Sequence, residues 1–330
     1  MDILDMLANG LRGMIGPEAA IYALAAIGLN VHFGYTGLLN FGQVAFMLVG
    51  AYGVAVSVIT FGWSMWVGIL VGLGCSVVLA LVLGIPTLRL RGDYLAIATI
   101  AAGEVLRYFY RSSWAEGTTG GVYGLRQFAS PFFDLNPYPP GRHGLGPFTF
   151  SAPNLWVMTV GWILVALVCG LVALLIKAPW GRVLRAIRED ELAARSLGKN
   201  VFSMKMQSLV LGGMIGALAG ALLAINVQSV SPDTYDPKVT FYLYTIVILG
   251  GAARVMGPVI GSIIFWFVVS FFDSFLRGAT SAGVIPDWLL TGSDSGPARF
   301  AIVGLGLVLL MIYRPAGIIG NQKEMRFDVH

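Results

Sequence analysis

A run of sequence without charge decides the fold: residues 19–88 read AAIYALAAIGLNVHFGYTGLLNFGQVAFMLVGAYGVAVSVITFGWSMWVGILVGLGCSVVLALVLGIPTL, with no Asp, Glu, Lys or Arg. A helix that crosses a bilayer needs about 20 mostly apolar residues, so a run of this length is long enough for three such helices. Further charge-free runs cover His143–Ile176, Met206–Pro232, Val239–Ala253, Val255–Phe272 and Phe300–Tyr313. The pattern predicts a protein that crosses the membrane repeatedly.

The composition excludes the soluble globular class. Of the 330 residues, 57% are apolar and 12% are charged, and the mean hydropathy is +0.78. Soluble domains carry about 25% charged residues, which cover their water-facing surface. We therefore expect an all-α fold, a polytopic transmembrane helical bundle of about 8–10 membrane segments, surrounded by lipid and forming one domain over residues 1–330. The net charge of +4 requires no nucleic-acid partner, and Cys75 and Cys169 lack the neighbours of a metal site.

The apolar runs predict where the helices lie. We expect them near 18–33, 40–60, 65–88, 94–111, 154–176, 204–227, 239–252, 257–276 and 298–313. The second segment opens with polar and glycine residues and 239–252 is short, so a re-entrant or broken helix stays open at both places. Residues 1–16 lack the basic flank and cleavage pattern of a signal peptide, so the first apolar run is expected to remain in the mature protein.

The distribution of Lys and Arg predicts the orientation. The connector around 177–205 holds seven of the 21 basic residues, and basic connectors favour the cytoplasm. Alternate crossings then place 13 of the 21 basic residues inside, with the loops 112–153 and 277–297 outside. The N-terminus is expected outside and the C-terminus inside the cell.

The cytoplasmic connector, 177–203, predicts a short helix between two breaks. Pro179 and Gly181 interrupt the preceding membrane helix, and Gly198 stands where a helix stop is usual. The acidic run 189–191 suits the positive N-terminal end of a helix. A small apolar stripe around Ala193 favours docking against a soluble partner, although a helix lying on the membrane surface fits the same pattern.

The same connector resembles the coupling loop of ABC importer permeases. Two alanines are followed after three residues by glycine, within the run Arg188-Glu-Asp-Glu-Leu-Ala-Ala-Arg-Ser-Leu-Gly198. The usual Glu before the alanine pair is displaced by Leu192, a departure typical of the branched-chain amino-acid subfamily. Further segments resemble the same Liv-type permease family, M-type subunit, in the same order along nearly the whole chain: Gly34–Gln43, Arg91–Thr99, Thr119–Gly121, Gly250–Pro258 and Tyr313–Gly317.

This resemblance implies the function and the partners. It implies the ABC importer permease fold and import of branched-chain or related amino acids by alternating access in a bacterial cytoplasmic membrane. The implied partners are two ABC ATPase subunits that carry ATP-Mg, a second related permease subunit and an extracytoplasmic substrate-binding protein. No cofactor is implied in this chain. The residues that would couple it to the ATPases are Arg185, Arg188, Glu189, Asp190, Glu191, Ala193, Ala194 and Gly198.

Some polar residues inside apolar runs are candidates for a translocation path. Amide side chains bond a zwitterion without imposing charge, and glycines expose backbone groups, so the candidates are Gly37, Asn40, Gly42 and Gln43. Hydrogen bonds that pack helices together fit Asn40 and Gln43 equally well. Glu104 and Arg107 lie three apart on one predicted helix and are expected to form a structural ion pair. His32 is expected to be structural.

The sequence offers no catalytic machinery. It contains no Gly-x-x-x-x-Gly-Lys-Ser/Thr phosphate loop, no His-Glu-x-x-His zinc pair and no Gly-x-Ser-x-Gly nucleophile turn. We therefore expect a transport subunit and no enzyme, with ATP hydrolysed elsewhere. Permeases for urea or short amides, and an ion-coupled secondary transporter, are the alternatives. The latter has Glu104 and Asp273 as candidate carboxylates, both near the ends of predicted segments.

Overall fold

The computed structural model describes residues 3–90, 92–145 and 148–281, together with positions 301, 304–306, 308, 312, 313 and 317–319. Helices dominate the described residues. The long ones are α1 (Ile3–Ile15), α2 (Pro17–Asn30), α3 (Gln43–Ile59), α4 (Met65–Thr87), α5 (Gly92–Arg111), α8 (Ala152–Lys177), α11 (Val201–Val227), α12 (Pro237–Gly250) and α13 (Gly257–Ser281). A π-helical turn, η1 (Val31–Tyr35), continues α2 directly.

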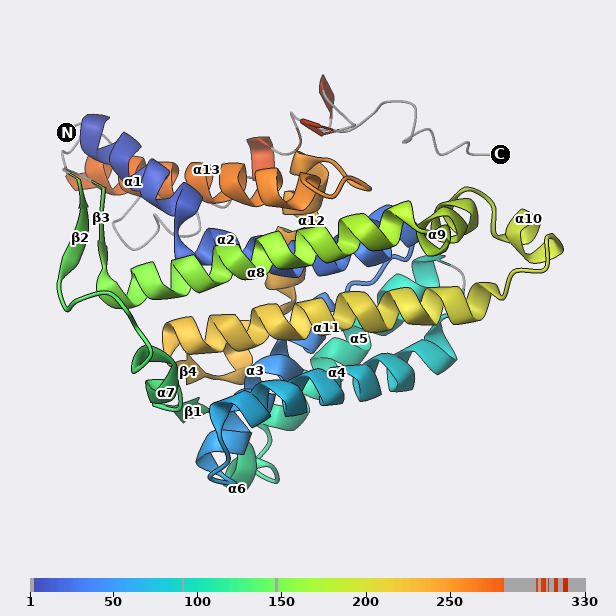
Figure 1. The fold of residues 1–330 in the computed structure, drawn as a ribbon, viewed down its shortest axis with the longest axis horizontal. Coiled ribbons are helices and arrows are strands. Elements are labelled where there is room, and N and C mark those ends of the chain that lie inside the picture. Colours follow the sequence, from blue (N-terminus) through green and yellow to red (C-terminus); the bar gives the residue numbers. More distant parts are fainter. Residues whose placement is uncertain are drawn as a thin grey trace.

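Short elements lie at the two ends of the bundle, and we name each end after them (Figure 1). The hairpin end carries α6 (Glu116–Thr119), α7 (Ser130–Phe133), a 3-10 turn η2 (Pro232–Tyr235), the antiparallel hairpin of β2 (Arg142–Leu145) and β3 (Phe148–Ser151), and the pair of β1 (Leu125–Arg126) with β4 (Ser229–Val230). The connector end carries α9 (Pro179–Glu189) and α10 (Glu191–Ser196). The helices between the two ends form the polytopic bundle that the sequence predicts.

Helices occupy eight of the nine predicted segments over the described residues. Four helices are long and apolar enough to cross a membrane: α4, α8, α11 and residues 257–280 of α13. α5 has 20 residues but carries Glu104, Arg107 and Arg111 in its second half. α3 and α12, with 17 and 14 residues, are shorter apolar helices. The predicted segment 298–313 lies largely outside the described residues.

An additional helix precedes the first predicted segment. α1 packs along α13, and it joins α2 at a bend of 42° between Ile15 and Pro17. The bend follows from local chemistry, because Gly16 adopts an extended backbone and Pro17 has no N–H to continue the helical ladder. Together the two helices form a candidate broken span, which the apolar run starting at Ala19 did not reveal.

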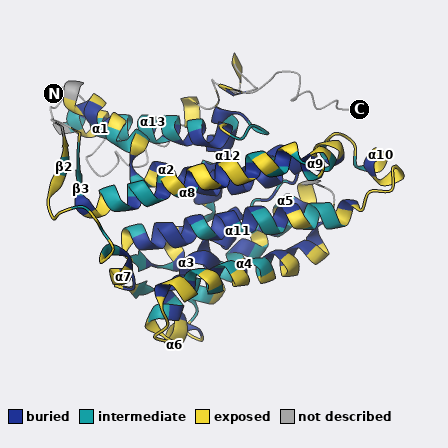
Figure 2. Cartoon of the chain, viewed as in Figure 1, coloured by how far each residue is buried: buried dark blue, intermediate teal, exposed yellow. Residues whose placement is uncertain are grey.

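The centre of the bundle is α11, which packs against α2, α3 and α4. In Figure 2 the ribbon of α11 is mostly buried, whereas α4 and α8 show long exposed stripes. Its glycines allow the contact: a Cβ on Gly212 would lie 2.4 Å from the Gly28 oxygen, and one on Gly220 would lie 1.9 Å from the Met47 oxygen. Glycine at these positions therefore permits close helix packing.

We expect Gly220→Ala to lower the unfolding temperature and the yield of monodisperse protein in detergent. Its methyl group would meet the backbone of α3, which cannot move without shifting the helix, and overpacking of this kind costs about 1–3 kcal/mol. Gly170→Ala on α8 is the matched control, because a Cβ there meets nothing within 4 Å. Equal unfolding temperatures for both variants would contradict the packing.

Candidate functional site

The backbone between η1 and α3 is not helical, and it lies inside the bundle. Its N–H and C=O groups therefore need hydrogen-bond partners from the surrounding protein. The Phe41 N–H donates to Thr99 Oγ1 on α5 at 3.0 Å, and the Val44 N–H donates to Thr240 Oγ1 on α12 at 3.1 Å. The Asn40 oxygen accepts from the Tyr244 hydroxyl at 3.1 Å. Residues 37–42, called the polar turn below, are therefore irregular backbone that bonds the helices around it, the condition for such backbone at membrane depth.

The side chains of the polar turn reach across to α11. Asn40 donates through Nδ2 to His32 Nδ1 at 3.1 Å, and its Oδ1 accepts from the Gly42 N–H at 2.9 Å. His32 therefore holds its proton on Nε2 and donates it to the Leu209 oxygen at 3.1 Å. Gln43 donates through Nε2 to the Gly212 oxygen at 3.1 Å. All three side chains are buried, so the network joins α2, α3 and α11.

The structure brings together the four residues predicted to line a path. Gly37, Asn40, Gly42 and Gln43 all lie in or beside the polar turn, with Gly37 at φ +73°. A Cβ on Gly37 would touch Arg188 of α9, and one on Gly42 would touch the Thr99 backbone oxygen at 2.6 Å. In this conformation the two amides bond protein groups, as helix packing requires, and their contact with a substrate stays a prediction.

Several residues that form hydrogen bonds with the polar turn could not be identified as its partners from the sequence. Thr99, Thr240 and Tyr244 lie in apolar helices far from it along the chain. Asn30 is equally inconspicuous, yet its side chain accepts from the Ala253 N–H and donates to the Arg254 oxygen, each at 2.9 Å. This pair of bonds fixes α2 to the loop between α12 and α13, where Ala253 has φ +60°.

The connector forms the predicted short helix, α10. Asp190 begins it, because its side chain accepts from the Ala193 N–H at 2.9 Å. Gly198 ends it at φ +74°, and the Lys199 N–H bonds the Ala194 oxygen at 3.2 Å. The acidic run and Gly198 therefore lie at the two ends of α10, whereas Pro179 and Gly181 begin a separate helix, α9, that the sequence did not predict.

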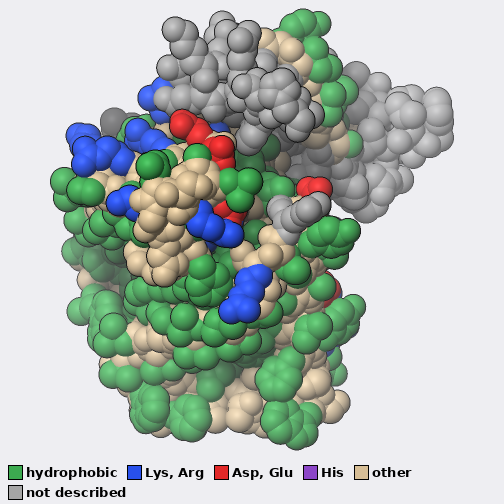
Figure 3. Space-filling view, turned by 90° about the vertical axis from the view of Figure 1, so that its right-hand side faces the viewer, with side chains coloured by type: hydrophobic (Ala, Val, Ile, Leu, Met, Phe, Trp, Pro, Cys, Tyr) green, Lys and Arg blue, Asp and Glu red, His purple; other side chains and the backbone are tan. Residues whose placement is uncertain are grey.

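The two alanines of the connector face opposite ways. Ala194 is 3% exposed and packs with Ile187 and Val201. Ala193 is exposed, beside Leu192 and Leu197, which are 71% and 79% exposed. Lys and Arg side chains gather on the same end of the molecule (Figure 3). This end offers an apolar surface in a basic setting, called the α10 face below: Leu192, Ala193, Ser196 and Leu197.

Ion pairs tie the connector to the bundle. Glu191 pairs with Lys205 at the start of α11 and with Arg195 on α10. Arg188 donates through Nη1 to the Gly34 oxygen, in the π-helical turn that precedes the polar turn. Arg185 and Glu189 border a cavity of about 220 Å³ with Arg188 and Arg254. α9 and α10 therefore contact both α11 and η1 directly, through Glu191 and Arg188.

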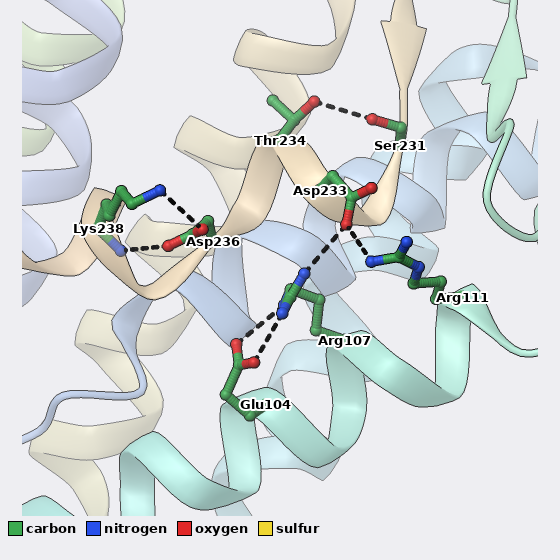
Figure 4. Close-up of polar contacts among 8 residues, drawn as sticks. All are labelled: Glu104, Arg107, Arg111, Ser231, Asp233, Thr234, Asp236 and Lys238. Atoms are coloured by element: carbon green, nitrogen blue, oxygen red, sulfur yellow. Dashed lines mark hydrogen bonds and ion pairs between the residues drawn. The ribbon is translucent and has the colours of Figure 1, made fainter. Parts of the chain in front are cut away.

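A charge cluster lies at the hairpin end, on α5 and η2 (Figure 4). Arg107 and Glu104 form the predicted ion pair, with Nη2 and Oε2 2.7 Å apart. Asp233 of η2 accepts from both Arg107 and Arg111 at 3.0 Å, through the same oxygen. The second Asp233 oxygen points away from the two arginines. Among the described residues no group of three or more His, Cys, Asp or Glu could hold a metal ion.

Apolar helices of membrane length, and irregular backbone enclosed between them, define a polytopic helical membrane protein. Residues 15–291 match the family described as the branched-chain amino acid transport system / permease component, and the chain belongs to this family of transport permeases. The predicted resemblance is confirmed.

Relatives with named functions extend over most of the chain. The high-affinity branched-chain amino acid transport system permease protein LivM of Escherichia coli K12 is 31% identical, over 91% of this chain and 68% of that protein. The probable branched-chain amino acid transport permease protein LivM of Methanocaldococcus jannaschii is 25% identical, over 92% and 91%. The guanosine ABC transporter permease protein NupQ of Bacillus subtilis is 24% identical, over 69% and 70%. No solved structure matches the chain significantly.

We expect Gln43→Leu to lower the unfolding temperature, because it removes the buried hydrogen bond to the Gly212 oxygen, a bond worth about 0.5–1.5 kcal/mol. Gln207→Leu, an exposed position on the same helix α11, is the control. Substrate uptake should be measured per folded molecule in the same preparations. Reduced uptake at an unchanged unfolding temperature would instead favour contact between Gln43 and substrate.

Proposed function

We propose that this chain is a permease subunit of an ATP-driven importer for branched-chain amino acids, with ATP hydrolysed by separate subunits. The observation that carries the proposal is the α10 face, an exposed small apolar surface on a helix anchored to the bundle. Membership of the permease family and the names of its relatives support the substrate class. The NupQ relative favours a nucleoside as the alternative cargo.

Energy would enter through the connector. An ATPase subunit that grips α10 would pull on α11 through the Glu191–Lys205 pair and on the polar turn through Arg188 and Gly34. Both routes lead to the buried network around Gln43, at the contact between α3 and α11. Rocking of these helices would open the path alternately to each side of the membrane, which is the alternating-access mechanism.

The proposal includes an assembly and an orientation. Two ATPase subunits would bind at the connector end in the cytoplasm, and a second related permease would lie beside this chain in the membrane. An extracytoplasmic binding protein would deliver substrate to the hairpin end. The basic side chains at the connector end support this orientation in a bacterial cytoplasmic membrane, because positive connectors are retained inside. The N-terminus would then be outside and the C-terminus inside.

We expect Ala193→Trp to weaken ATPase binding by about tenfold, because a bulky side chain in a docked interface costs about 1–3 kcal/mol. The readouts are co-purification of the ATPase and leucine uptake in reconstituted vesicles. Ser113→Trp, an exposed small residue at the hairpin end, is the control. Ala194→Trp should instead destabilise the chain itself, since Ala194 faces Ile187 and Val201. Full ATPase binding and uptake by Ala193→Trp would refute docking at α10.

We expect single cysteines at Ser196 and Leu135 to label from opposite sides of the membrane. Both positions are exposed, one on α10 and one at the hairpin end, and Cys75 and Cys169 would first be replaced by Ala. An impermeant thiol reagent applied to intact cells should modify Leu135→Cys alone. Modification of Ser196→Cys alone would reverse the orientation.

A further inference from the structure

A polar cavity of about 350 Å³, called the hairpin cavity below, lies where the end of α1 and the start of α2 meet the β2–β3 hairpin. The first turn of α8 and the last turn of α11 complete its wall. In Figure 1, α1, the hairpin and the start of α8 lie together at the hairpin end. The volume falls within the range of small-molecule sites, about 300–1,000 Å³.

Two arginines from different segments line the hairpin cavity. Arg12 belongs to the last turn of α1, where its Nη1 donates to Asn9 Oδ1 at 3.2 Å. That bond uses one of the five N–H donors of a guanidinium group. Arg142 of β2 lies opposite Ser151 of β3 in the hairpin register, so both side chains stand on one face of the hairpin and both line the cavity.

The electrostatics of the wall favour an anion. Its charged side chains are Arg12, Arg142 and Glu18, two cations and one anion, which gives a formal charge of +1. α2 and α8 also begin here, since their N-cap residues Gly16 and Ser151 line the cavity, and neither makes a side-chain cap hydrogen bond. The positive ends of two helix dipoles therefore reinforce the two guanidinium groups.

The remaining polar side chains of the wall carry hydroxyl and amide groups: Thr149, Ser151, Asn154 and Asn226. Such groups donate hydrogen bonds to phosphate oxygens, and the planar guanidinium of arginine matches a phosphate group with two parallel bonds. We propose that the hairpin cavity binds a phosphate group, supplied by the headgroup of an anionic phospholipid or by free phosphate. Arg12 and Arg142 bond the phosphate oxygens, so the ligand holds α1 against the hairpin.

The exposed side of α1 favours a lipid as the source of the phosphate. Leu7, Leu11 and Ile15 are exposed and recur at every fourth position, which places them in one stripe on the helix. An exposed apolar stripe on a helix that also carries a basic residue suits a membrane interface. Phospholipids are present in both leaflets, so the site requires neither the proposed orientation nor transport.

Native mass spectrometry of the full chain in detergent tests the site with dioleoylphosphatidylglycerol. The readout is the Kd of the first bound lipid. Arg12→Ala and Arg142→Ala should each raise this Kd about tenfold, because each removes charge-assisted hydrogen bonds to the phosphate. Arg126→Ala, which removes an exposed arginine of β1 at the same end, is the matched control and should keep the wild-type Kd.

Two further probes identify the source of the phosphate. Dioleoylglycerol has the same acyl chains without the phosphate, so it should not displace the phospholipid. Inorganic phosphate that displaces the lipid from the wild-type chain would assign the cavity to free phosphate, with the same two arginines as ligands. The unfolding temperature of each variant without lipid shows whether it is folded. Arg142→Ala carries the test if Arg12→Ala is unstable, because Arg142 is exposed and the hairpin pairing is made by backbone groups.

Three outcomes would overturn the proposal. One is a Kd that neither arginine variant changes, and another is displacement of the phospholipid by dioleoylglycerol. The third is an arginine variant that keeps the lipid but no longer co-purifies with an extracytoplasmic binding protein. That result would assign the two arginines to an acidic group of a protein partner.

Discussion

Six residues that are not helical, most of them buried or half-buried in the bundle, constrain how the surrounding helices assemble. The Phe41 N–H and the Asn40 oxygen of the polar turn find partners on α5 and α12, and the Val44 N–H that follows the turn finds one on α12. Thr99 of α5, and Thr240 and Tyr244 of α12, supply these hydrogen bonds. The short α3 follows from the same constraint, because it begins at Gln43, inside the bundle.

The hydrogen bonds from the His32 and Gln43 side chains to α11 can form only because the helices pack closely. His32 and Gln43 bond the carbonyls of α11 only because Gly212 lets that helix approach α2, with no side chain between them. Backbone carbonyls inside a helix are already engaged, and a second donor uses their remaining lone pair. The glycines and the amides thus work as one unit, since a bulkier residue on α11 would separate the pairs that the amides join.

The sequence predicts some of this architecture well and other parts poorly, for physical reasons. Charge-free length located the helices, and the Asp190 and Gly198 positions located α10, because both signals are local. α1 was missed because Arg12 and the polar start of the chain mask an amphipathic helix that packs on α13. The partners of the Asn40 oxygen and of the Gln43 side chain come from distant segments, α12 and α11, so no local pattern reveals them. The inward side of Ala194 depends on how α9 and α11 fold around α10.

The two-sided construction of α10 bears on how such a subunit can change over evolution. One side of this six-residue helix belongs to the core through Ala194, and substitutions there disturb the chain's own folding. On the other side, Leu192 and Leu197 are largely exposed among the described residues. Mutations can therefore accumulate on the outward side at little cost to stability, so recognition of a partner can drift while the helix keeps its place. Gene duplication would give such a subunit a new partner without requiring a new fold.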